Sequence, residues 1–78
     1  MSKLTHIFSS VLGIEESKIV PELSPQNASS WDSINAIILV TEIEKAFGIS
    51  FTYDEVMGVK NFADVIRLVE SKGGDTNA

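Results

Sequence analysis

A carboxylate and a hydroxyl follow one another at Asp32-Ser33, directly ahead of a stretch rich in apolar residues. Because residues 33–47 repeat apolar side chains with helical spacing, both groups are expected at the start of a helix. N-capping is the usual role of Asp or Ser at such a position. A helix start also offers free N–H groups and the positive end of the helix dipole, which suit a phosphate. The pair therefore predicts either a simple helix cap or an attachment point for a phosphodiester on Ser33.

The sequence does not supply Ser33 with the partners of a catalytic nucleophile. His6 is the only histidine, and it is expected on the exposed side of another helix, while no lysine is close to Ser33 in the sequence. The chain has no cysteine, which excludes thiolate zinc sites and disulfides. We therefore expect no catalytic residues and no metal site, and a stand-alone enzyme is not expected.

Composition and charge limit the remaining function classes. The 78 residues are 44% hydrophobic, enough for one small core, so one domain is expected over residues 1–73 with a flexible tail at 74–78. Eleven acidic residues against six basic ones give a net charge of −5, which would repel a nucleic acid. No apolar run approaches the roughly 20 residues that span a bilayer, and no signal-peptide pattern is present. We therefore expect a cytoplasmic protein that binds neither nucleic acid nor membrane.

Apolar spacing and turn residues together predict an all-α fold: a small four-helix bundle with a long first loop and a short third helix. The third helix is expected from the capping box Thr52-Tyr53-Asp54-Glu55 to about Met57. The first helix is expected from Ser2 to Gly13, and the second from Ser33 to Gly48. The third is expected from Thr52 to Gly58, and the fourth from Asn61 to Gly73.

The first loop is expected to lie against the core. Residues 14–30 lack helical spacing and contain Pro21 and Pro25. Trp31, at the end of the loop, is either a further anchor on the core or a partner contact, and the anchor is favoured because aromatic side chains bury large areas. Four apolar residues could pin the loop in place: Ile14, Ile19, Val20 and Leu23.

The second helix has two apolar faces. One is a core stripe of Ala36, Leu39, Val40, Ile43 and Phe47. The other contains Ile34, Ile37, Ile38 and Thr41, with Ser33 at its border. A helix that is apolar all round is normally interior, so Ile37 could be buried or exposed. Ile34 and Ile38 lie opposite the core stripe, which predicts an exposed docking patch.

These residues resemble a known family. Asp32-Ser33-Ile34, followed by the core stripe of the second helix, is similar to the Asp-Ser-Leu segment of acyl carrier proteins. The similarity covers nearly the whole chain: a first helix, a long loop, the modified serine opening helix two, a short third helix and a closing fourth. The chain's length and acidity, together with the Gly48-Ile49 that follows helix two, add to this resemblance.

The resemblance implies that a phosphopantetheinyl transferase, using coenzyme A and magnesium, attaches a 4′-phosphopantetheine arm to Ser33. The thiol of that arm would carry an acyl group as a thioester, supplied by an acyl-loading ligase or acyltransferase and passed to a downstream synthase. The carrier would be monomeric and non-catalytic. Asp32 would help the transferase engage the site. The implied partner-facing surface is Ile34, Asn35, Ile37, Ile38, Thr41, Glu42 and Glu44.

The resemblance also has departures. Ile38 stands where the carriers of fatty-acid synthesis commonly have an acidic residue, and Trp31 stands where a small residue is common. These departures favour a dedicated lipid, polyketide or surface-glycan pathway. The alternatives are a peptidyl or aryl carrier of nonribosomal synthesis and an unmodified helical interaction module. Val56, Met57 and Val59 are expected as ordinary core residues, with the lining of an acyl-chain site as the alternative.

Overall fold

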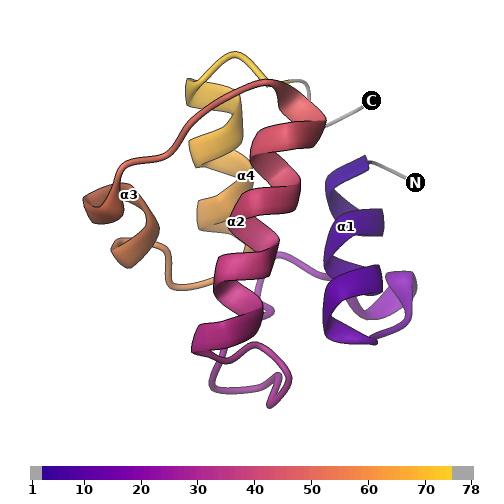
Figure 1. Ribbon diagram of the computed structural model, residues 1–78. Helices are drawn as coiled ribbons and strands as arrows, with labels where there is room; N and C mark the ends of the chain where they lie inside the picture. Colours follow the sequence, from indigo (N-terminus) through magenta and orange to yellow (C-terminus); the bar gives the residue numbers. More distant parts are fainter. Residues whose placement is uncertain (1–2, 75–78) are drawn as a thin grey trace.

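The computed structural model describes residues 3–74, which form a bundle of four α-helices with one short 3-10 helix. The elements are α1 (Lys3–Leu12), η1 (Glu16–Lys18), α2 (Ser33–Phe47), α3 (Tyr53–Met57) and α4 (Phe62–Ser71). Figure 1 shows α2 in the middle, with α1 on one side, the short α3 on the other and α4 behind it. No strand occurs within residues 3–74. The expected all-α fold is confirmed.

Side-chain caps set most of the helix starts. Asp32, Thr52 and Asn61 are the N-caps of α2, α3 and α4, and each side chain accepts a hydrogen bond from a backbone N–H three residues later. Thr52 and Glu55 form the complete capping box that the sequence predicts. Gly48 ends α2 in the left-handed conformation, with φ of 66°, which a glycine adopts without strain. The expected cap Ser2 and the tail residues 75–78 lie outside the described residues.

The core is one cluster to which α1, α2, α4 and the long loop contribute, whereas α3 has no buried residue. Phe8 of α1 is at its centre and meets Phe62 of α4 edge to face, with ring centroids 4.7 Å apart. The loop is held down by Ile19, Leu23, Ala28 and Trp31, all buried. Trp31 is therefore an anchor of the loop, as favoured from the sequence. Val20 is exposed, so the prediction that it pins the loop is wrong.

The long loop also caps α4. The first N–H groups of a helix have no acceptor within the helix itself. In α4, the N–H of Phe62 donates to the carbonyl of Leu23 at 2.8 Å, and the N–H of Ala63 donates to that of Pro21 at 3.0 Å. These two bonds fix the loop against the start of α4. The loop also contains η1, a single turn that the sequence analysis did not predict because it has neither side-chain cap nor buried face.

Candidate functional site

The start of α2 places an exposed hydroxyl at the first helical residue. Asp32 is the N-cap, and its carboxylate accepts a hydrogen bond from the N–H of Asn35 at 2.8 Å. Ser33 follows as the first residue of α2, and it is exposed. Among residues 3–74 nothing forms a hydrogen bond with the Ser33 hydroxyl. The capping role therefore belongs to Asp32, which leaves the oxygen of Ser33 free for chemistry.

The backbone around Ser33 suits an anionic group. The N–H groups of Ser33 and Ile34 have no acceptor within the described part of the chain, and they lie at the positive end of the α2 dipole. A phosphate bonded to the Ser33 oxygen could accept hydrogen bonds there. The side chain of Asn35 donates to the carbonyl of Ser30 at 2.7 Å, which ties the preceding loop to α2. The residues present therefore fit a phosphodiester on Ser33.

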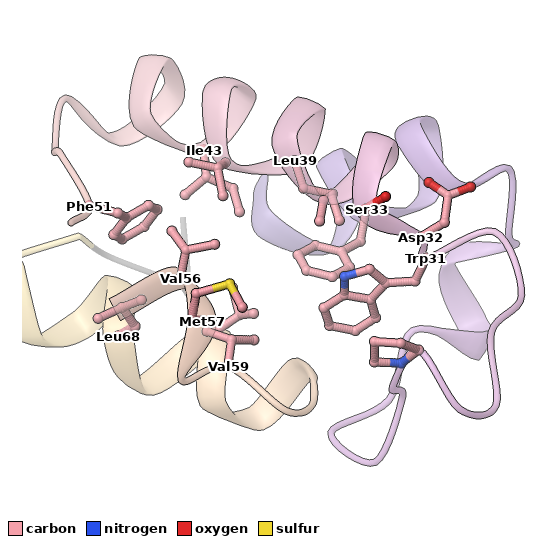
Figure 2. Close-up of a pocket in the computed structure, with 15 residues that line it drawn as sticks. Trp31, Asp32, Ser33, Leu39, Ile43, Phe51, Val56, Met57, Val59 and Leu68 are labelled. Atoms are coloured by element: carbon pink, nitrogen blue, oxygen red, sulfur yellow. The ribbon is translucent and has the colours of Figure 1, made fainter. Parts of the chain in front are cut away.

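An apolar cavity of about 420 Å³ lies next to this helix start, between α2, α3 and α4. Figure 2 shows Asp32 and Ser33 at one end, with the Ser33 hydroxyl directed away from the interior, and Phe51, Val56 and Leu68 towards the other end. The polar side chains of Asp32 and Ser33 are confined to the rim. The cavity is lined by Phe8, Pro25, Trp31, Asp32, Ser33, Ala36, Leu39, Val40, Ile43, Phe51, Val56, Met57, Val59, Val65 and Leu68.

The three residues around α3 line this cavity, and Val59 also packs against the core cluster. Val56, Met57 and Val59 all contact the cavity, and none is fully buried. Met57 is 63% exposed, so the favoured prediction of a core position is wrong for this residue. The short α3 cannot bury a face of its own, because its five residues make little more than one turn. Leu68 was missed as a lining residue, although its position three residues after Val65 is one turn further along α4.

The second apolar face of α2 is exposed. Ile37 is 67% exposed, which resolves the choice between burial and exposure for this residue. Ile38 is 42% exposed, whereas its neighbour Leu39 on the core stripe is only 3% exposed. Ile34 and Thr41 are exposed as well. The exposure of this face agrees with the predicted docking patch, and its role in partner binding stays a prediction.

The polar residues of the predicted partner surface differ in their contacts. Glu42 is exposed, and no ion pair or hydrogen bond of its side chain is found within residues 3–74. Glu44 is half-buried, and its carboxylate accepts a hydrogen bond from the N–H of Phe51 at 2.8 Å. Asn35 is also half-buried and bonded to the loop. Glu44 and Asn35 therefore have structural roles that the sequence analysis did not predict.

Residues 3–74 contain neither a metal-binding cluster nor a membrane-spanning helix. No group of three or more His, Cys, Asp or Glu side chains is placed to hold a metal ion. No helix in this part of the chain is both long and apolar enough to cross a bilayer.

A four-helix bundle with an exposed serine at the start of α2, beside an apolar cavity, defines the class of carrier domains that bear a prosthetic arm. Residues 2–69 match the family model of the phosphopantetheine attachment site, and the chain belongs to this family. It is similar to the solution NMR structure of the holo acyl carrier protein from Geobacter metallireducens, with 30% identity and a TM-score of 0.80. That match covers 88% of this chain and 79% of the other.

The chain is therefore a carrier protein of the acyl carrier type, and its cofactor is a covalently attached 4′-phosphopantetheine. This finding disfavours the alternative of an unmodified helical interaction module. The arm, once attached, supplies the thiol that a chain without cysteine cannot provide itself.

Proposed function

We propose that Ser33 is the attachment point of the phosphopantetheine arm, and that residues 1–73 are one non-catalytic carrier domain that presents acyl thioesters to biosynthetic enzymes in the cytoplasm. The observation that carries this proposal is the Ser33 hydroxyl. It is exposed, free of hydrogen bonds within residues 3–74, and attached to a helix start with unpaired N–H groups. Asp32 caps the helix and stays exposed, so its carboxylate is accessible to the transferase.

The cavity supports an aliphatic cargo. Its lining is hydrocarbon and aromatic, with the charged and hydroxyl groups of Asp32 and Ser33 only at the rim. Burial of an acyl chain there removes apolar surface from water, by about 25 cal/mol for each Å². The amino group of an aminoacyl cargo would be charged, and the one carboxylate of this lining, that of Asp32, lies at the rim and not in the apolar interior. The cavity therefore favours an acyl carrier over a peptidyl carrier.

The outer face of α2 supports a partner surface that is more apolar than acidic. Ile34, Ile37 and Ile38 are exposed together, and Glu42 adds one charge free of internal contacts. Isolated exposed apolar residues need no explanation, but three on one helix face next to Ser33 are typical of a binding surface. We expect the loading ligase or acyltransferase, the downstream synthase and the phosphopantetheinyl transferase to bind a monomer here. An apolar docking face favours a dedicated lipid, polyketide or surface-glycan pathway.

Mass spectrometry of the modified protein tests the attachment site. The unmodified protein is incubated with coenzyme A, magnesium and a broad-specificity phosphopantetheinyl transferase. We expect the mass to rise by one phosphopantetheine group. Ser33→Ala should abolish this addition, whereas Ser29→Ala, at an exposed serine of the preceding loop, should retain it. Addition to Ser33→Ala, or no addition to the unaltered chain, would refute the proposal.

The cargo class can be tested in the same preparation. Adenylating ligases that activate fatty acids are compared with ligases that activate amino or aryl acids, each supplied with its own acid. Loading by fatty-acid ligases is expected. Efficient loading with an amino acid instead would favour the peptidyl carrier.

A further inference from the structure

Trp31 lies where the cavity begins, two residues before Ser33. Its side chain is only 7% exposed, and its indole ring meets Phe8 edge to face with centroids 5.2 Å apart. Figure 2 shows the ring next to Ser33, with its nitrogen on the edge that faces the cavity. A group that passes from Ser33 into the cavity must therefore pass the indole ring.

The indole N–H is an unpaired donor at this position. Tryptophan can only donate, through its single ring N–H. Within residues 3–74, no oxygen accepts a hydrogen bond from that group. Among the residues lining the cavity, only Trp31 and Ser33 have side chains that donate hydrogen bonds, and Ser33 lies at the rim. The cavity thus contains one donor, fixed by the packing of its ring, in an otherwise apolar lining.

Within residues 3–74, the buried side-chain atom that lacks a hydrogen-bond partner is Oε1 of Glu16, so the indole nitrogen of Trp31 is still in contact with solvent. A chain that fills the cavity would remove this contact, and the indole N–H would then need an acceptor from that chain. The acceptor that suits an N–H in an apolar cavity is a neutral carbonyl oxygen, because a charged acceptor would lose too much hydration there. Three such sources come with a loaded arm: the amide carbonyls of phosphopantetheine, the thioester carbonyl and an oxo group on the acyl chain. All three offer the same chemistry to the indole.

We propose that Trp31 holds the loaded arm in the cavity by donating a hydrogen bond from its indole N–H to a carbonyl oxygen that the arm brings there. This inference rests on the proposed attachment at Ser33. The packing on Phe8 keeps the indole ring in place, so the donor is already oriented when the carbonyl arrives. A loaded arm that offers a carbonyl at this depth is retained in the cavity, whereas one that offers only hydrocarbon leaves the donor unpaired.

The experiment follows the indole N–H by NMR. Trp31 is the only tryptophan, so a ¹⁵N-labelled sample gives one indole signal. Four states are compared: the unmodified chain, the chain with the arm alone, and the chain loaded from hexanoyl- or 3-oxohexanoyl-coenzyme A. Mass spectrometry first establishes the loading of each sample on Ser33.

A hydrogen bond should move the indole proton to lower field and slow its exchange with water by about fivefold or more. If the change is already present with the arm alone, the acceptor is an amide of the arm. If it is present with both acyl groups but not with the arm alone, the acceptor is the thioester carbonyl. If it is present only with the 3-oxohexanoyl group, the acceptor is the oxo group of the cargo. An indole signal that is the same in all four states would overturn the proposal while leaving attachment intact. No loading on Ser33 in the mass spectrum would instead refute the attachment, and with it this inference.

A variant removes the donor and keeps the ring. Trp31→Phe should still contact Phe8 and should still be loaded at Ser33. We expect its thioester to hydrolyse about fivefold faster than that of the wild-type chain, because the carbonyl is no longer held in the cavity. The faster hydrolysis should affect both thioesters when the acceptor is an amide or the thioester carbonyl. It should affect only the 3-oxohexanoyl thioester when the acceptor is its oxo group. Tyr53→Phe, at an exposed aromatic residue outside the lining, is the matched control and should leave hydrolysis unchanged. Equal hydrolysis in Trp31→Phe and the wild type would contradict the proposal.

Discussion

The carboxylate of Asp32 accepts a hydrogen bond from the backbone N–H of Asn35 at 2.8 Å, and this contact frees the intervening Ser33 from any capping role. Asn35 in turn holds the carbonyl of Ser30 through its side chain, at 2.7 Å. The two bonds fix the loop and the first turn of α2 on either side of the exposed serine. Ser33 is thus presented by a local structure that does not depend on its own side chain.

Substitutions of Asp32 separate its capping role from its proposed role in transferase recognition. Asp32→Ala should lower the free energy of unfolding by about 1 kcal/mol, because the N–H of Asn35 loses its acceptor. Asp32→Asn should retain most of that stability, since Asn caps helices nearly as well. Urea denaturation measures both. If the charge guides the transferase, Asp32→Asn should still be modified more slowly than the wild type. Equal modification rates would limit Asp32 to capping.

Glu44 and Glu42 should differ in what they contribute to the fold. Glu44→Ala leaves the half-buried N–H of Phe51 without its acceptor, which should lower the free energy of unfolding by about 1–3 kcal/mol. Glu44→Gln retains an acceptor and should restore most of the loss. Glu42→Ala, at an exposed side chain without internal contacts, should change stability by less than about 0.5 kcal/mol. Equal destabilisation by the two alanine variants would contradict this assignment.

The helices could be predicted from the sequence because their signals are local. Asp32, Thr52 and Asn61 each precede an apolar repeat, and each caps the expected helix. The exposed hydroxyl of Ser33 was also predictable, because its position relative to the core stripe of α2 follows from helical geometry.

Contacts between distant segments could not be predicted in this way. The bond from Phe51 to Glu44 depends on how the loop after α2 turns back, which no spacing within the helix encodes. Val20 and Met57 are apolar but exposed, because the loop and the short α3 each have more apolar residues than their contacts can cover. The cavity beside Ser33 is lined by residues of all four helices and of the long loop, so neither its size nor the place of Trp31 in it could be derived from one segment.

Ile38 and Leu39 are neighbours on α2 with opposite surroundings, which allows a matched test of the docking patch. Ile38→Glu should lower the free energy of unfolding by about 1 kcal/mol or less, because the residue is 42% exposed and the new carboxylate can reach water. Leu39→Ala should cost about 2–5 kcal/mol, since it empties a core position. Ile38→Glu should also weaken binding to the partner enzyme, measured by calorimetry on the modified protein. A strong loss of stability in Ile38→Glu would show that this side chain belongs to the core.

The pair of Glu55 and Lys72 connects α3 to the end of α4, with the carboxylate and ammonium groups 2.7 Å apart. The hydrogen bond from Lys72, followed by that from the N–H of Thr52, lowers the pKa of Glu55 below its ordinary value. A carboxyl group whose pKa is lower in the folded than in the unfolded state stabilises the fold when it is ionised. That contribution is complete above the unfolded pKa of about 4.3 and is lost as the pH falls through the lower folded pKa.

Melting temperatures measured at low salt between about pH 7 and pH 3 test this contribution. The wild type should lose stability below about pH 4.3, and Glu55→Gln should lose less over the same interval, because Gln keeps the capping box but does not titrate. Some acid sensitivity should remain in the Glu55→Gln variant, because Asp64 also has a lowered pKa. The N–H of Lys60, and then the guanidinium of Arg67, lower the pKa of Asp64 through hydrogen bonds to its carboxylate. Lys72→Gln should likewise reduce the fall in melting temperature between about pH 7 and pH 3. If both variants lose as much melting temperature as the wild type over this interval, the pair contributes nothing to the attachment of α3.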